Sequence, residues 1–145
     1  MPATRKAVLG LTVVWCLFGI AGCGNPKSPT IKGTAVFPAN ITFQGNDSVM
    51  INFSPADPAN TAGFSAIAED KSFSVKSASG KAMLPGKYMI GVSVTPYDQK
   101  NRTAVIDDFN KVFGNPQTSG LTYELTAEDT QSITVDLVKK TVTKQ

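Results

Sequence analysis

Histidine is absent from this chain of 145 residues, which removes the commonest general base, the Ser-His-Asp triad and imidazole metal ligands. The glycine patterns that bind dinucleotides or nucleoside triphosphates are also missing. Three carboxylates remain as candidate reactive groups, Asp57, Asp107 and Asp108. Adjacent carboxylates in a loop are usually solvated, and a calcium loop needs more oxygen ligands at fixed spacing. The sequence therefore predicts a protein that is not an enzyme and holds no cofactor and no metal.

Cysteine and tryptophan are scarce, and both are confined to the N-terminal segment. The chain has two cysteines and one tryptophan, at Trp15, Cys16 and Cys23. Long apolar runs are missing too, apart from the stretch from Ala7 to Ala21 that only Thr12 interrupts. A membrane-spanning helix needs about 20 apolar residues. This run is too short to span comfortably.

The same segment has the three parts of a secretory signal: positive charge at Arg5 and Lys6, an apolar centre, and small residues at its exit. Ile20-Ala21-Gly22-Cys23 places a cysteine where a lipobox has its acceptor. We expect cleavage between Gly22 and Cys23 and a diacylglycerol on the Cys23 thiol. An uncleaved anchor and a conventionally cleaved peptide are the alternatives. Because one acyl chain anchors only marginally, two or three chains would hold the protein durably.

Removal of this signal changes the composition of the remaining chain. The net charge of +3 falls to +1 because Arg5 and Lys6 leave while all 11 acidic residues stay. The only small basic cluster is Lys139-Lys140 with Lys144 beyond, which favours a solvated tail over nucleic acid. With Cys16 removed and Cys23 acylated, no cysteine is left for a disulfide, so the core and strand pairing must hold the domain together.

The remaining chain predicts one domain on a tether. Residues 1–22 form the signal, and residues 23–30, rich in small and polar residues and proline, suit an extended tether. A β-sandwich follows over residues 31–138, and residues 139–145 form a polar tail. We expect a bacterial cell-envelope protein that is membrane-anchored through Cys23. Because Gly24 rather than aspartate follows the cysteine, we expect the outer membrane.

Short strands separated by turn residues fill the domain, as in an all-β sandwich. Alternation places one set of residues inward, namely Val49, Ile51, Phe53, Tyr88, Ile90, Val92, Val94, Ile133, Val135 and Leu137. Phe64, Ala66 and Ala68 alternate similarly and lead through a polar turn into Phe73, which predicts a hairpin. Residues 121–125 and 132–138 are expected to pair. Residues 96–120 read as an extended loop with one helical turn near residues 106–109.

Several segments resemble carboxypeptidase regulatory-like domains, the transthyretin-like β-sandwiches. The similar segments are Gly33 to Val36, Ile51 to Pro55, Asp70 to Val75 and Leu84 to Tyr88. Phe113 to Thr122 is similar to a signature of small bacterial lipoproteins that carry this domain, in which Thr-Ser-Gly-Leu-Thr precedes the last two strands. Where the family usually has Asp-Gly, this chain has Asp70-Lys71. The resemblance implies a seven-stranded Greek-key sandwich with, for most such lipoproteins, no established activity.

Aromatic residues near the long loop give the remaining candidate site. Tyr97, Phe109 and Phe113 are expected either to form an interaction surface or to pin the loop onto the sandwich. The sequence favours a lipid-anchored, non-catalytic envelope protein that acts as a structural or protein-interaction module. The alternative is a lipoprotein that binds a glycan or small solute, with the loop aromatics as its contact surface.

Overall fold

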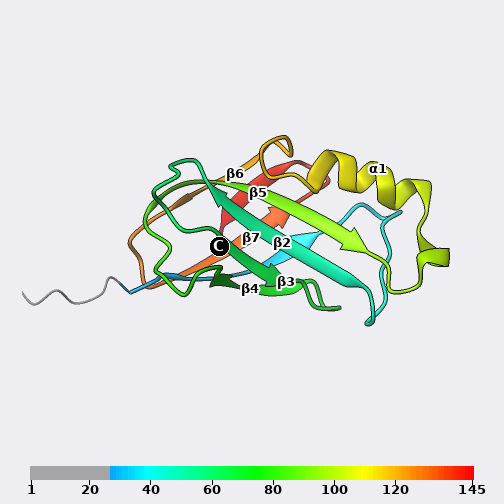
Figure 1. The fold of residues 1–145 in the computed structure, drawn as a ribbon, viewed down its shortest axis with the longest axis horizontal. Coiled ribbons are helices and arrows are strands. Elements are labelled where there is room, and N and C mark those ends of the chain that lie inside the picture. The colour runs from blue at the N-terminus through cyan, green and yellow to red at the C-terminus, as the bar shows by residue number, and fades with distance from the viewer. Residues whose placement is uncertain (1–26) are drawn as a thin grey trace, which may run out of the picture.

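The computed structural model describes residues 27–145; the predicted signal, its cleavage site and Gly22 and Cys23 lie outside these residues. The described chain folds into eight strands, one 3-10 helix and one α-helix (Figure 1). Their bounds are β1 Thr30–Val36, β2 Ser48–Pro55, β3 Gly63–Ala66, β4 Ser72–Ser77, β5 Gly86–Thr95, η1 Gln99–Asn101, α1 Ala104–Phe113, β6 Leu121–Leu125, β7 Thr130–Asp136 and β8 Thr141–Lys144. The expectation of an all-β fold is confirmed, with α1 as an addition to it.

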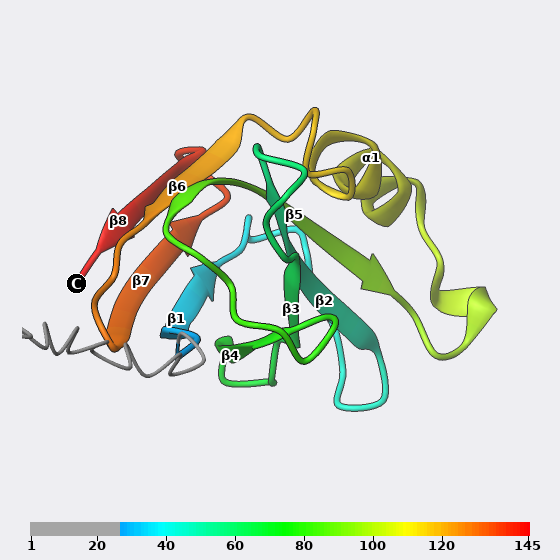
Figure 2. The same ribbon diagram turned by 60° about the vertical axis from the view of Figure 1, so that its left-hand side comes forward.

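The strands form one mixed sheet in the order β6-β5-β2-β3-β4-β1-β7-β8. All neighbours are antiparallel except β1 and β7, which run parallel from Thr30↔Thr130 to Val36↔Asp136. The sheet curls until its two edges, β6 and β8, approach each other, so that it is nearly closed into a barrel (Figure 2). The side chains that face inward on all strands therefore share one core.

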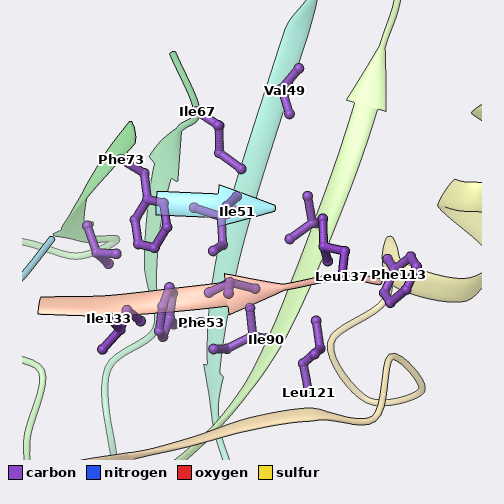
Figure 3. Packing of buried hydrophobic residues seen from close by; sticks show 14 of the residues in the cluster. Val49, Ile51, Phe53, Ile67, Phe73, Ile90, Phe113, Leu121, Ile133 and Leu137 are labelled. Atoms are coloured by element: carbon purple, nitrogen blue, oxygen red, sulfur yellow. The ribbon is translucent and has the colours of Figure 1, made fainter. Parts of the chain in front are cut away.

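That core contains the residues that alternation placed inward on β2, β5 and β7. Ile51, Ile90 and Ile133 are fully buried, and Figure 3 shows them converging from three strands with Phe53 and Phe73. A buried aliphatic side chain contributes about 1.5–3 kcal/mol relative to an exposed one. In the part of the chain that the structure describes, every buried side-chain polar atom has a hydrogen-bond partner.

The predicted facing of β3 is wrong, although its hairpin with β4 is present. Phe64 and Ala66 point outward, while Gly63, Ser65 and Ile67 are the buried positions. Ile67 forms a bridge with Phe73 and places the odd positions inside. A Cβ at residue 63 would collide with Met83 and Val75, so this strand meets the core with small residues rather than with its phenylalanine.

The predicted pairing of β6 with β7 is also wrong. β6 pairs with β5, from Gly86↔Leu125 to Ile90↔Leu121, whereas β7 pairs with β1 and β8. The connection between them crosses from one half of the sheet to the other. The buried Gln131 side chain stabilises this connection through two hydrogen bonds. Its Oε1 accepts a hydrogen bond from the Tyr123 hydroxyl at 2.6 Å, and its Nε2 donates to the Thr126 carbonyl at 2.9 Å.

Residues 139–145 continue the sheet instead of forming only a tail. β8 pairs with β7 from Asp136↔Thr141 to Ile133↔Lys144, and Val142 packs against the core. Lys144 forms an ion pair with Glu128 in the crossing from β6 to β7. The polar composition of this segment reflects an exposed edge strand, on which charged side chains are common.

Candidate functional site

The two ends of the sheet differ, and Figure 1 shows them at opposite ends of its long axis. The basal end, where β1 and β7 begin, comprises residues 27–30, 56–62, 78–85 and 126–129. The helical end comprises residues 36–47, 67–71, 96–120 and 137–140 and carries α1. The three candidate aromatic residues all lie at the helical end.

The segment 96–120 contains a helix of ten residues, α1, which includes the helical turn predicted near residues 106–109 but extends well beyond it. The segment as a whole is therefore less of a loop than the sequence predicted. Thr103 caps the first turn of α1, with its hydroxyl accepting the Ile106 N–H at 3.3 Å. Ile106, Phe109 and Phe113 are buried, and their spacing of three and four residues puts them on one face. Because a helix this short is marginal alone, this apolar face holds it against the sheet.

An asparagine on the same helix binds the edge of β5. The Asn110 side chain accepts the Val94 N–H at 2.8 Å and donates to the Val94 carbonyl at 2.7 Å. β6 pairs with β5 only from Gly86 to Ile90, so Asn110 satisfies backbone groups of β5 beyond the end of β6. The helix is thereby fixed in position as well as packed.

Of the three candidate aromatic residues, only Tyr97 is at the surface. Its exposed fraction is 78%, whereas Phe109 and Phe113 are 6% and 5% exposed. The predicted surface of three aromatic residues is therefore absent. The alternative, that aromatics pin the segment onto the sandwich, describes Phe109 and Phe113.

These two phenylalanines belong to an aromatic row that crosses the helical end. Phe43 and Phe37 meet edge to face with ring centroids 5.1 Å apart. Phe37 stacks on Phe109 at 5.8 Å, and Phe109 contacts Phe113 at 5.0 Å. Such pairs add about 0.5–1.5 kcal/mol each beyond burial. The row joins the β1–β2 connection to α1, and the sequence signal for it was the apolar periodicity of residues 106, 109 and 113.

A lysine lies over each end of this aromatic row. The Lys71 ammonium is 3.3 Å from the Phe43 centroid, and the Lys140 ammonium is 5.8 Å from that of Phe113. Both have a positive φ, 68° and 54°, a conformation that favours glycine. Each contact is worth about 0.5–1 kcal/mol at an exposed site.

Asp47 connects two segments of the helical end. Its carboxylate accepts the Gln44 N–H at 2.8 Å and the Tyr97 N–H at 2.9 Å. The hydrogen bond from Gln44 and then that from Tyr97 lower the pKa of the Asp47 carboxyl below its ordinary value. The ionised carboxylate therefore holds the β1–β2 connection against the end of β5, directly beside the exposed ring of Tyr97.

Two adjoining hollows lie between the β1–β2 connection and α1, and both are bordered by Asn40 and Val105. The first, of about 360 Å³, is mainly apolar and includes Ile41 and Val112. The second, of about 450 Å³, is lined by Thr42, Phe43, Gln44 and Asn101 and by the charged residues Asp47 and Lys100. A larger hollow of about 550 Å³ lies at the basal end. The helical hollows offer apolar, neutral polar and charged groups for contact with a ligand or partner.

The segment from Phe113 to Thr122 forms the turn that follows α1. Backbone N–H groups of Thr118 and Ser119 donate to the Asn115 carbonyl at 3.1 and 3.0 Å. The buried Ser119 hydroxyl donates to the Ile90 carbonyl and accepts the Leu121 N–H. Gly120 has φ 77°, which only glycine adopts easily. These residues direct the chain from α1 into β6.

The three candidate carboxylates do not converge. Asp57 lies at the basal end, where it accepts the Ala59 N–H at 2.9 Å. Asp107 at the helical end pairs with Arg102 at 2.7 Å, and Asp108 pairs with Lys111 at 3.1 Å. Within residues 27–145 no group of three or more histidine, cysteine, aspartate or glutamate residues is placed to hold a metal ion.

No protein-family model, no curated protein and no solved structure matches this chain. In residues 27–145, α1 and every other helix fall short of the length and apolar character needed to cross a membrane.

Proposed function

We propose that this chain is a lipid-anchored, non-catalytic protein of the bacterial cell envelope whose helical end docks another protein. One observation carries the docking role. Five of the seven large apolar side chains that are exposed in residues 27–145 lie at the helical end, namely Val36, Tyr97, Val105, Val112 and Val138. Two of these, Val105 and Val112, line one hollow, and a contiguous exposed apolar surface is typical of a contact site.

The anchor in this proposal is Cys23, acylated after cleavage between Gly22 and Cys23. The small residues before Cys23 and the apolar run behind Arg5 and Lys6 support it. Gly24 supports placement in the outer membrane. The Cys23→Ser variant should leave the membrane fraction or retain its signal, and mass spectrometry of the wild type should find acylated Cys23. A wild-type chain that is freely soluble and unmodified would contradict the anchor.

We further propose that the domain is a transthyretin-like sandwich of the carboxypeptidase regulatory-like type. The curled sheet supports this relationship, because its two halves, β6-β5-β2-β3 and β4-β1-β7-β8, enclose one core between them as the two sheets of a sandwich do. The turn of the Phe113 to Thr122 signature supports it too, because Ser119 and Gly120 have the structural roles that a recurring sequence would preserve.

The docking role is tested by site-specific photocrosslinking in intact cells. A photoreactive residue at Val112 should give a discrete crosslinked band, while one at Thr122, an exposed residue on β6, should not. The Val105→Asp substitution places a charge beside Val112 in the same apolar hollow and should abolish the band. Equal crosslinking from both positions, or a band that is insensitive to Val105→Asp, would contradict docking through the helical end.

A second candidate function is the binding of a glycan or small solute in the hollow of about 450 Å³. Asn40, Thr42, Gln44 and Asn101 line this hollow together with Phe43, Asp47 and Lys100, and polar groups that share a hollow with an aromatic residue suit a sugar. A glycan array probed with the whole protein, followed by thermal shift with each positive sugar, tests this role. A hit that survives Asn101→Ala and Thr42→Ala would place the ligand elsewhere.

A further inference from the structure

In the structure, the chain first contacts the folded domain at Ser28. This contact is closer to the predicted anchor at Cys23 than the domain start at residue 31 that the sequence predicted. The Ser28 hydroxyl oxygen accepts the Met83 N–H at 3.1 Å, and the Thr30 N–H donates to the Asp129 carbonyl at 2.8 Å. Only residues 24–27 therefore separate Cys23 from the first contact with the domain. An extended chain covers at most about 3.6 Å per residue, so Ser28 stays within about 18 Å of Cys23.

This short connection leaves the basal end near the anchor and the helical end far from it. β5 runs from the basal to the helical end and contains ten residues, which corresponds to a length of about 33 Å. The helical end can reach the membrane only if the domain lies on its side. The domain can therefore either lie flat on the membrane or stand on its basal end, and the charges on the two ends favour one of these orientations.

The basal end has a surplus of positive charge. Six lysines lie on it or on the adjoining strand ends against four carboxylates: Lys27, Lys32, Lys76, Lys81, Lys87 and Lys144 against Asp57, Glu124, Glu128 and Asp129. Lys144 is paired with Glu128, and Lys87 lies opposite Glu124 in the β5–β6 register. The remaining lysines are exposed, and none forms an ion pair within the described chain.

The hollow of about 550 Å³ lies on the same end, next to the point where the chain enters. Ser28, Lys81 and Leu84 line it, and Lys81 is its single charged lining residue. Leu84 is 40% exposed. An ammonium group beside an exposed leucine suits the boundary between lipid headgroups and acyl chains, where lysine binds phosphate and apolar side chains insert shallowly.

We propose that the basal end is a docking surface for anionic lipid headgroups, so that the domain stands on the membrane and presents its helical end away from it. This inference rests on the proposed acylation of Cys23. Each lysine near an anionic surface strengthens binding by about fivefold, and the attraction weakens with salt. The lysines thus orient a domain that the acyl chains alone would leave free to tilt.

Energy transfer from single sites on the protein to the membrane tests this orientation. Full-length protein is expressed, and the processed lipidated form is placed in vesicles with a headgroup-linked acceptor dye. Once Cys16 is removed and Cys23 acylated, an introduced cysteine is the only free thiol. Ser79→Cys labels the basal end and Val112→Cys the helical end, and both positions are exposed.

In vesicles containing phosphatidylglycerol, the label at residue 79 should transfer energy strongly and that at residue 112 weakly. Transfer from residue 79 should fall in pure phosphatidylcholine and at high salt. The double substitution Lys27→Gln with Lys81→Gln should remove the part that depends on phosphatidylglycerol. Lys100→Gln with Lys111→Gln removes the same charge from the helical end and should leave it intact.

The outcomes separate this inference from the anchor. Intact mass is measured first, and a chain without acyl groups on Cys23 would end both proposals. An acylated chain with equal transfer from the two labels, or with transfer indifferent to phosphatidylglycerol and to the basal lysines, would overturn the headgroup contact and leave the anchor standing. Stronger transfer from residue 112 would show the opposite orientation and also overturn it.

Discussion

The two ends of the sheet use their positive charges in different ways. At the helical end, Arg102 and Lys111 pair with the carboxylates of Asp107 and Asp108, and Lys139 lies 3.7 Å from that of Asp136. Lys71 and Lys140 lie over the aromatic row. At the basal end most lysines have no such partner. The difference indicates that charges at the helical end organise the fold, whereas charges at the basal end remain available for an external anion.

The apolar residues show the opposite arrangement. Exposed valines and Tyr97 lie at the helical end, whereas the basal end has Leu84 and, opposite Lys76 on an adjoining strand end, Phe64. A surface with satisfied charges and exposed apolar groups favours contact with protein, and one with free lysines favours phosphate. This difference supports the proposal of a different partner for each end of one small domain.

The largest effect is expected from the aromatic row. Phe109→Ala removes the ring that contacts both Phe37 and Phe113 and should lower the free energy of unfolding by about 3–5 kcal/mol. Tyr97→Ala, at the exposed aromatic residue of the same end, should change it by less than about 0.5 kcal/mol. Chemical denaturation measures both. Equal losses would contradict the division between a structural aromatic row and an exposed Tyr97.

The buried hydrogen bonds beside the basal end should rank next. Gln131→Ala leaves the Tyr123 hydroxyl and the Thr126 carbonyl without their partner, which should cost about 1–3 kcal/mol. Burial already raises the pKa of the Tyr123 phenol, so its neutral O–H remains a donor at neutral pH. In the matched variant Tyr123→Phe, the loss should be smaller because the Gln131 amide keeps its bond to Thr126. A larger loss in Tyr123→Phe would refute this assignment.

Substitutions of Lys71 should change the free energy of unfolding by less, and the order of stability of two variants tests the cause. Lys71→Gln removes the ammonium from the ring of Phe43 but keeps a side chain at positive φ, and should cost about 0.5–1 kcal/mol. Lys71→Gly also loses the ammonium, but it relieves a left-handed conformation that costs about 1–2 kcal/mol for other residues. The glycine variant should therefore be more stable than the glutamine variant in thermal unfolding. The reverse order would show that the backbone is unstrained there.

The smallest effect is expected from protonation of Asp47. Hydrogen bonds from Gln44 and Tyr97 lower the pKa of this carboxyl in the folded state, so its contribution to stability is present above the pKa of the unfolded chain, near pH 4. The contribution is lost as pH falls through the lower pKa of the folded state. The stability difference between wild type and Asp47→Asn should thus shrink between pH 5 and pH 2. A constant difference over that range would contradict the role of the charge.

Alternation within single strands was enough to predict much of the core. Val49, Ile51 and Phe53 on β2 are buried as predicted, because large apolar residues at every second position leave one face for the core. The same rule gave the wrong face for residues 64–68. It placed the large Phe64 inward, but Phe64 is exposed. There the facing depends on Met83 and Val75, which occupy the space beside Gly63.

The candidate site could be predicted only in part. Apolar residues at 106, 109 and 113 were visible in the chain, but a helix of ten residues depends on its contacts with Phe37 and with β5. Residues distant in sequence provide those contacts. The acylation of Cys23, in contrast, is a chemical prediction that the described residues do not include, and it stays a prediction for mass spectrometry.

Some properties of this protein followed from the order of residues alone: no histidine chemistry, no cysteine beyond residue 23, and inward faces for β2, β5 and β7. These depend on which side chains are present or on positions two residues apart. Tertiary structure decided the partner of β6, the facing of β3, the burial of Phe109 and the attachment of Ser28 to the domain. Each depends on a contact such as that between Ser28 and Met83, 55 residues apart, which no local pattern encodes.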